Sequence, residues 1–310
     1  MTRVGVPPPI SPRAGLGRAR RAYDRIVTGV AFVAGLSPVV VIVALLLSLA
    51  KASSDVGVRA LTSSTWNPAL GKLGLLPFMV SSIVTSAGAI ALAAPIAIFS
   101  AVFLSEMASP RATRFGGLLL EIAAATPSVV LGLWATVDVV PLVGRLGAAL
   151  GEGALGAQGY GTLSASIVLA IMSMPTIAVL ATAILRAVPD ELREASIALG
   201  ATRWEMVRHV LLPTARRGIA GAVLLGFARA IGETVAVALV VGGRGALVAS
   251  PFHPTATLSS LLVDEVPDAT APPHLGAIAV AALLLLLIGA GASVGSRALL
   301  RAPRTKGRAA

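Results

Sequence analysis

Six long runs of apolar residues divide the chain, and shorter polar segments separate them. The runs fall at about residues 26–50, 78–104, 118–140, 161–187, 218–241 and 276–300. Each is long enough for an α-helix to cross the apolar part of a bilayer, which takes about 20 residues. The pattern therefore predicts an all-α integral membrane protein with six transmembrane helices and with both ends on the same side of the membrane.

The segment 188–213, between the fourth and fifth apolar runs, is the longest strongly charged interval of the chain. It predicts two short helices. Gly200 suits the left-handed stop of the first helix. Thr202 and Glu205 have the spacing of a capping box at the start of the second helix, and Pro213 is expected to close that helix. Such a helix-turn-helix between two spans would offer a rigid knob to a partner.

Two other interpretations of this segment stay open. It could be an amphipathic hairpin that only solvent surrounds. It could also be a DNA-binding helix-turn-helix, which its basic residues favour but which the apolar runs on either side oppose.

Composition supports the membrane assignment and changes the meaning of the net charge. Hydrophobic residues make up 56% of the 310 residues and charged residues only 13%, which is too apolar for a soluble domain. Most Lys and Arg residues lie in the two ends and in the second and fourth connecting segments. By the positive-inside rule, both termini and the segment 188–213 are therefore expected to be cytoplasmic. The net charge of +11 is thus a sign of topology, with contacts to anionic lipid as a second role and nucleic acid not expected.

The same pattern predicts the domain organisation. Residues 1–25 form a basic tail without hydrophobic periodicity, which predicts a mostly disordered segment. Residues 26–77 hold the first transmembrane helix and an external segment. Residues 78–301 form the transmembrane core, and 302–310 is a second basic tail.

Arg229 and Glu233 are a charged pair inside the fifth apolar run. At a spacing of four residues they would lie one turn apart on one face of a continuous helix. Each charge alone costs about 2.5–3.5 kcal/mol at the centre of a membrane helix on insertion scales, so both are expected to face protein or water. Two interpretations are open: an ion pair that fixes helix packing, or an arginine whose fork binds an oxyanion in a transport pathway.

The sequence offers no machinery for catalysis or for binding ATP. The lysines are Lys51, Lys72 and Lys306, and none lies in the G-x-x-x-x-G-K-[ST] pattern of a phosphate-binding loop. Cysteine is absent and the three histidines are scattered, so no metal site is expected. We therefore expect a chain that binds no cofactor itself and is not an enzyme.

The segment 188–213 resembles the "EAA" loop of ABC-importer permeases. Glu194-Ala195-Ser196, then Gly200, then Leu212-Pro213 carry this resemblance. It implies that the loop, including Thr202 and Arg203, docks into a groove on a cytoplasmic ATPase.

The fifth apolar run extends the resemblance and makes it more specific. The sequence RAIGETVAVALVVG, which begins at Arg229, resembles the fifth span of the Pst phosphate-import permeases, and its continuation is closer to the PstC type than to the PstA type. Pro127-Ser128-Val129-Val130 and Met174-Pro175-Thr176 agree with it.

The resemblance implies the fold and the partners. The fold would be that of a type I ABC importer permease in a bacterial inner membrane. The partners would be a homologous sister permease, a cytoplasmic ABC ATPase dimer that uses ATP, and an extracytoplasmic phosphate-binding protein. Arg229 and Glu233 would belong to the substrate pathway. A permease for another oxyanion, such as molybdate or sulfate, and an ion-coupled secondary carrier remain alternatives.

Overall fold

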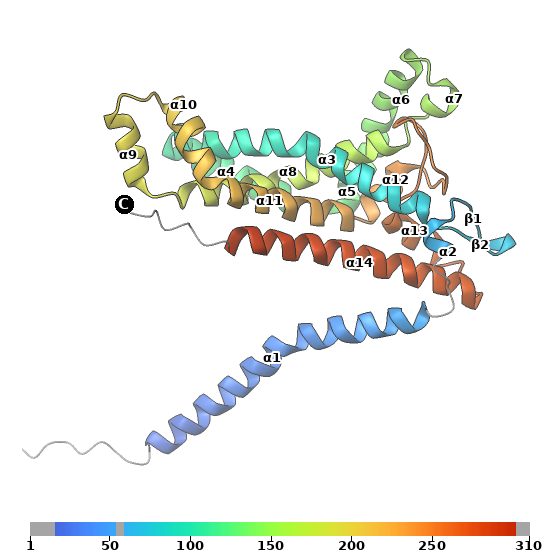
Figure 1. Cartoon of the computed structure of the whole chain (residues 1–310), viewed down its shortest axis with the longest axis horizontal. Helices are drawn as coiled ribbons and strands as arrows, with labels where there is room; N and C mark the ends of the chain where they lie inside the picture. Colours follow the sequence, from blue (N-terminus) through green and yellow to red (C-terminus); the bar gives the residue numbers. More distant parts are fainter. Residues whose placement is uncertain (1–15, 54–58, 302–310) are drawn as a thin grey trace, which may run out of the picture. The chain divides into compact units, whose positions relative to one another are not determined.

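The computed structural model describes residues 16–53 and 59–301, and the described residues are mostly α-helical (Figure 1). Five helices are long and apolar enough to cross a membrane, or six when a sharply bent pair counts as one span. This confirms the predicted all-α membrane fold. The chain divides into two units, Met1–Lys51 and Ala52–Ala310.

The described part of the first unit is one long helix, α1 (Leu16–Ala52), which contains Pro38. Its apolar side chains, such as Phe32, are exposed within the unit. The helix begins before the predicted start of the first span at residue 26, so part of the predicted disordered tail is helical. Residues 1–15 and the predicted tail 302–310 lie outside the described residues.

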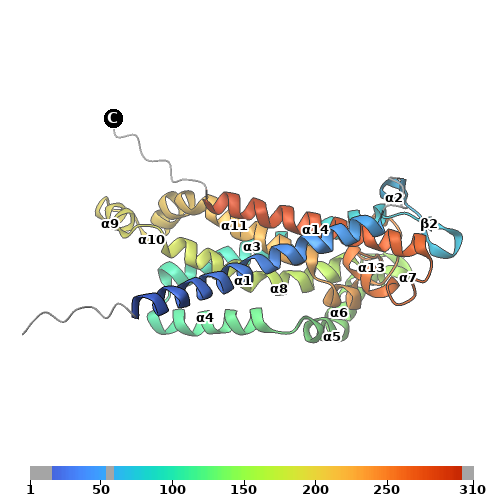
Figure 2. The ribbon, with the colours of Figure 1, turned by 90° about the horizontal axis from the view of Figure 1, so that it is seen from below.

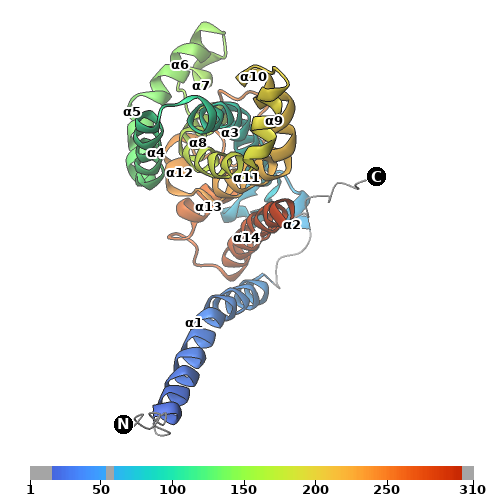
Figure 3. The ribbon, with the colours of Figure 1, turned by 90° about the vertical axis from the view of Figure 1, so that its left-hand side faces the viewer.

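The second unit is built on four long helices. These are α3 (Leu76–Val102), α8 (Thr162–Arg186), α11 (Leu212–Gly232) and α14 (Pro272–Arg301). Figure 3 looks along this bundle from the end that carries α9 (Asp190–Ala198) and α10 (Arg203–Met206). Two single wide turns of π-helix, η2 (Phe103–Met107) and η3 (Val207–Leu211), follow α3 and precede α11.

Small residues bring the central helices together. On α3, Ala89, Ala93, Ala97 and Ala101 recur every fourth residue and are buried. Small side chains on one face let helix backbones approach closely, which is how membrane helices pack when the solvent is as apolar as the protein. The hydroxyl of Ser166 on α8 donates to the backbone carbonyl of Thr85 at 3.0 Å, and this hydrogen bond further fixes the α3–α8 pair.

The third predicted span contains the break that Pro127-Ser128 predicts. It consists of α4 (Pro110–Ala125) and α5 (Ser128–Val137), whose axes differ by 87°. Pro127 lies at the break, where it lacks the N–H that a continuous helix needs. After α5, the chain turns into α6 (Val139–Ala149) and α7 (Gly153–Gly156) (Figure 2), so the predicted bounds 118–140 of the span are wrong.

The end of the bundle opposite α9 and α10 is a small mixed cap (Figure 1). It contains the helices α2 (Arg59–Thr62), α12 (Val235–Val241) and α13 (Leu258–Glu265), the turn η1 (Pro68–Leu70), and the antiparallel strands β1 (Trp66–Asn67) and β2 (Lys72–Leu73). The indole N–H of Trp66 donates to Glu265 at 2.9 Å, and the ring packs edge-on against Phe78. This contact ties the hairpin to α13 and α3.

Candidate functional site

The loop formed by α9 and α10 has the two local signals expected from its sequence. Gly200 follows α9 with φ +86°, which confirms the predicted left-handed stop. The side chain of Thr202 accepts from the N–H of Glu205 at 3.3 Å, and Glu205 accepts from the N–H of Thr202 at 2.8 Å. This reciprocal pair confirms the capping box. Two short helices therefore meet at a tight, defined turn.

The prediction that Pro213 closes the second helix is wrong. The chain stays helical from α10 through the wide turn η3 into α11, and Pro213 lies in the first turn of α11. A π-turn inserts an extra residue into the hydrogen-bond ladder, so the proline ring is accommodated without ending the helix. The loop is thus rigidly continuous with a membrane span, because Arg203–Gly232 is one candidate span.

The tip of this loop exposes large apolar side chains. Leu199 is 89% exposed, and Leu192, Ile197 and Trp204 are also exposed. Glu194 and Ala195 of the sequence motif are exposed beside them, as are Thr202 and Arg203. Ser196 differs, because it is buried and its hydroxyl donates to the carbonyl of Leu192 at 2.8 Å. Ser196 therefore stabilises α9, and the other residues form the accessible face.

An ion pair that sequence reasoning missed holds the base of the loop. Arg193 on α9 donates from Nε and Nη2 to the two carboxylate oxygens of Glu106 in η2, at 3.2 and 3.1 Å. The same guanidinium donates to the carbonyls of Val188 and Leu185 and to Asp190. The hydrogen bonds and the negative charge of Glu106, with a further contribution from Asp190, raise the pKa of Arg193, although burial acts in the opposite direction. Local sequence could not reveal the pair, because 87 residues separate its partners.

Glu106 is nearly enclosed at this junction. Its side chain is 7% exposed and that of Arg193 is 16% exposed. Removal of one partner of such a bidentate, largely buried ion pair strongly destabilises the protein, because the other charge then stays buried without a partner. The pair therefore fixes α9 to the end of the span α3–η2.

The second predicted site is arranged differently from the prediction. The helix α11 ends at Gly232, and Glu233 follows it in an extended conformation, φ −72° and ψ 125°. Arg229 and Glu233 are therefore not on one face of a continuous helix, and no ion pair joins them in the described part of the chain. Glu233 instead lies at the start of α12, where it accepts a long 3.5 Å bond from the N–H of Ala236.

Among the residues that the structure describes, Arg229 has neutral hydrogen-bond partners only. Its guanidinium donates to the hydroxyl of Thr176 on α8 at 2.9 Å and to the carbonyl of Ala124 on α4 at 3.3 Å. The residue is exposed in the isolated chain. Arginine carries five N–H donors. Because the two partners are neutral oxygens, the guanidinium of Arg229 keeps its positive charge and has further N–H donors available to an anion.

Two helix breaks surround this arginine. Ala124 is the second-last residue of α4, just before the α4–α5 break, and Arg229 lies in the last turn of α11, before the α11–α12 break. The short halves beyond the breaks pack on each other, since a Cβ on Gly132 of α5 would lie 2.9 Å from the Cα of Ala236 on α12. A broken helix at membrane depth leaves backbone N–H and C=O groups without helical partners, and these must form hydrogen bonds with protein, water or a polar ligand. The arrangement provides a polar, positively charged point between the two ends of the bundle.

Among the described residues, no group of three or more His, Asp and Glu could hold a metal ion.

A sequence model of one protein family matches residues 93–304, and its description is "Binding-protein-dependent transport system inner membrane component". Two similar proteins are phosphate transport system permease proteins PstC. The one from Mesorhizobium japonicum is 33% identical over 250 residues, which cover 77% of this chain and 76% of that protein. The one from Xylella fastidiosa is 33% identical over 263 residues, which cover 81% of each.

Solved structures agree at the level of the fold. One similar chain belongs to the MetNI methionine ABC transporter, with a TM-score of 0.52 and 19% identity over 76% of this chain and 99% of that chain. Another comes from a bacterial ABC transporter involved in import of the acidic polysaccharide alginate, with a TM-score of 0.58 and 14% identity over 89% of this chain and 98% of that chain.

Proposed function

The chain belongs to the family of binding-protein-dependent transport system inner membrane components, and from this premise we propose that it is a permease subunit of an ATP-driven phosphate importer. The observation that carries the proposal is Arg229, an exposed cation between two helix breaks with only neutral partners. An oxyanion such as phosphate presents several acceptor oxygens to such a fork. The similarity to PstC proteins supports phosphate as the substrate.

Energy would reach this site through the loop of α9 and α10. Exposed apolar side chains at its tip suit a docking surface for another protein, here a cytoplasmic ATPase dimer that hydrolyses ATP. We propose that Glu194, Ala195, Gly200, Thr202 and Arg203 lie at this contact. Ser196, Leu212 and Pro213 would support it from behind, in α9 and at the start of α11.

A sister permease would complete the pathway. A charge that faces lipid at membrane depth is costly, so an exposed Arg229 needs a protein or aqueous surface opposite it. Helix α4 has no buried residue in the isolated chain and lies beside this site, which leaves a face for a second subunit. The pathway would then run between the two permeases.

The distribution of basic residues gives the proposed orientation of the chain in the membrane. We place the loop of α9 and α10 and both termini on the cytoplasmic side of an inner membrane, because Lys and Arg concentrate there. The cap that contains α12 and α13, together with α6 at the same end, would then face the extracytoplasmic phosphate-binding protein. Membrane lipid would surround the remaining apolar surface.

Two alternatives remain distinct from this proposal. A permease for molybdate or sulfate would use the same guanidinium of Arg229. Competition between these anions and phosphate in an uptake assay therefore distinguishes this alternative from a phosphate permease. An ion-coupled secondary carrier would need no ATPase, and the exposed apolar tip together with the Arg193–Glu106 pair favours the ATP-driven mechanism.

Substitution of Arg229 tests the substrate site. The complete transporter, reconstituted in liposomes, should lose at least about tenfold in phosphate uptake with Arg229→Gln, because a charge-assisted hydrogen bond contributes about 1.5–3 kcal/mol. Arg229→Lys should retain part of the uptake. Arg297→Gln, which removes an exposed arginine from α14, is the matched control. Normal phosphate uptake by Arg229→Gln would contradict the assignment of this site.

A further inference from the structure

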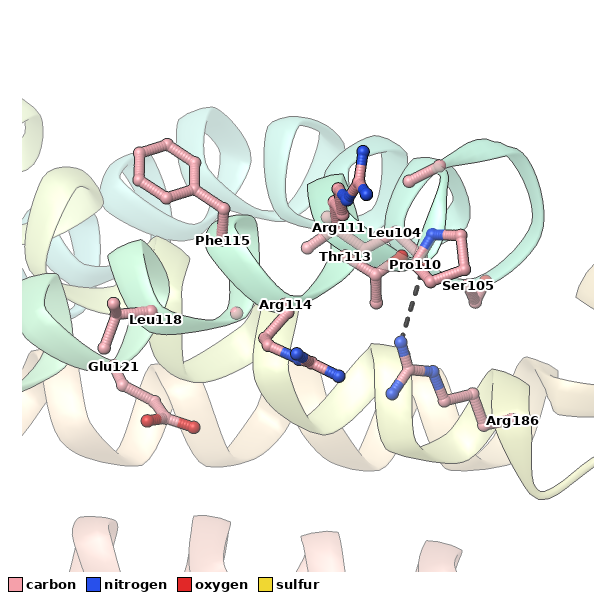
Figure 4. Close-up of a pocket in the computed structure, with 12 residues that line it drawn as sticks. Leu104, Ser105, Pro110, Arg111, Thr113, Arg114, Phe115, Leu118, Glu121 and Arg186 are labelled. Carbon is pink, nitrogen blue, oxygen red and sulfur yellow. Dashed lines mark hydrogen bonds between the residues drawn. The ribbon is translucent and has the colours of Figure 1, made fainter.

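A separate open pocket lies at the α9–α10 end of the bundle, where α4, α8 and η2 meet. Its volume is about 930 Å³, and Figure 4 shows its lining side chains. Three arginines line it, Arg111, Arg114 and Arg186, together with the single acidic residue Glu121. The pocket has the size of a small-molecule site and a clear excess of positive charge.

Two of these arginines face the same space. In Figure 4 the guanidinium groups of Arg114 on α4 and Arg186 on α8 point into the region between the two helices, whereas Arg111 points to the other side of α4. Arg186 is oriented by a hydrogen bond from Nη2 to the carbonyl of Leu104 at 3.3 Å. Neither Arg114 nor Arg186 has an acidic partner among the described residues. Their charges are therefore available to an anion.

The pocket continues toward Arg229 along the contact between α4 and α8. Thr176, which holds Arg229, is on the same helix as Arg186, ten residues earlier, or about 15 Å along the axis at 1.5 Å per residue. A smaller cavity of about 230 Å³ extends along this contact and is lined by Glu121, Val179 and Thr182 as well as by Arg186. Ala124, the other partner of Arg229, lies one turn beyond Glu121 on α4.

We propose that Arg114 and Arg186 form a second oxyanion site, which the transported anion occupies after it leaves Arg229 and before it reaches the cytoplasm. This inference rests on the proposed function. A pathway conducts when each site binds strongly enough to accept the ion and weakly enough to release it, and successive sites satisfy both conditions. Glu121, between the two cationic points, adds a negative charge that keeps the anion from being held tightly.

The phosphate group of an anionic lipid has the same chemistry as the transported anion, and arginines near a membrane surface attract it. Arg186 lies on α8, and Thr176 of the same helix accepts a hydrogen bond from Arg229. This shared helix favours the transported anion as the ligand. Lipid composition separates the two sources, because neutral phosphatidylcholine removes anionic headgroups without removing the transported phosphate.

The test uses the complete transporter in liposomes of phosphatidylcholine, with and without added phosphatidylglycerol. The variants are the double substitutions Arg114→Gln with Arg186→Gln and Arg114→Lys with Arg186→Lys, and Arg297→Gln on α14 is again the control. The readouts are the initial rate of radiolabelled phosphate uptake and the ATP hydrolysis stimulated by the binding protein.

We expect the glutamine pair to lower uptake about tenfold in both lipids while stimulated ATP hydrolysis persists, because one charge-assisted bond is worth about 1.5–3 kcal/mol. The lysine pair keeps both charges and should restore most of the rate. Persistent ATP hydrolysis in the glutamine pair would show that its subunits still assemble. Unchanged uptake in neutral lipid, with a defect only when phosphatidylglycerol is present, would overturn the proposal in favour of a headgroup site. Failure of the proposed function itself is distinct, since the unaltered transporter would then take up no phosphate.

Discussion

Gly200 shows how a single residue sets the shape of the loop between α9 and α10. Its φ of +86° lies in the region that favours glycine, and a Cβ placed on it would meet no atom within 4 Å. Within this chain, any effect of a substitution therefore comes from the backbone conformation and not from a clash.

We predict that Gly200→Ala destabilises this turn by about 1–2 kcal/mol, the cost of a left-handed conformation for a residue with a Cβ. The stimulated rate of ATP hydrolysis and its coupling to phosphate uptake should both fall. Gly289→Ala in α14 is the control, because that glycine is helical and its Cβ position is open, so alanine should be neutral or slightly stabilising. Identical coupling ratios in the two variants would show that the turn conformation is irrelevant.

Arg229 marks the limit of reasoning from sequence at the residue scale. Its position within an apolar run was enough to single it out. Its partners were not predictable, because Thr176 and Ala124 are 53 and 105 residues away. The expected neighbour, Glu233, is separated from it by a helix end that contains no proline and hence gives no strong local signal.

At the scale of elements, the Arg193–Glu106 pair joins the loop to a span. The pair attaches α9 to η2, which directly follows α3, and α10 continues through η3 into α11. The loop is thus connected to two spans, one through side chains and one through the backbone.

We predict that Arg193→Ala separates ATP hydrolysis from transport, because it leaves Glu106 enclosed without its partner, a change that typically costs about 3–5 kcal/mol. The number of phosphate ions transported per ATP should fall. Asp190→Ala is the control: that carboxylate is 86% exposed in its side chain, and an exposed ion pair contributes about 0–1 kcal/mol. The exchanged pair Arg193→Glu with Glu106→Arg should recover part of the coupling. No difference between Arg193→Ala and the control would refute the mechanical role of this pair.

Local sequence signals predicted elements unevenly. The capping box at Thr202 and the stop at Gly200 depend on neighbouring residues, and both are present. Pro127 marks the break after α4 in the sequence, whereas the 87° angle of that break and the wide turns η2 and η3 depend on packing against helices distant in sequence. The closure of the second helix at Pro213 was therefore predicted wrongly.

For the whole molecule, apolar runs long enough to cross a bilayer predicted the fold class, and their charged connections gave the expected orientation. The assembly could not be worked out from periodicity, because an isolated chain does not define what covers its exposed cation or its apolar loop tip. Resemblance at the loop and around Arg229 supplied the expected partners.

The central claim is that this chain is a passive gate moved by a separate ATPase that grips the α9–α10 loop. The most direct test measures accumulation of radiolabelled phosphate in liposomes that contain this chain and its sister permease, with and without the ATPase subunits, in the presence of ATP and the binding protein. Accumulation against a concentration gradient should require the ATPase subunits and ATP hydrolysis. Accumulation by the two permeases alone would contradict it.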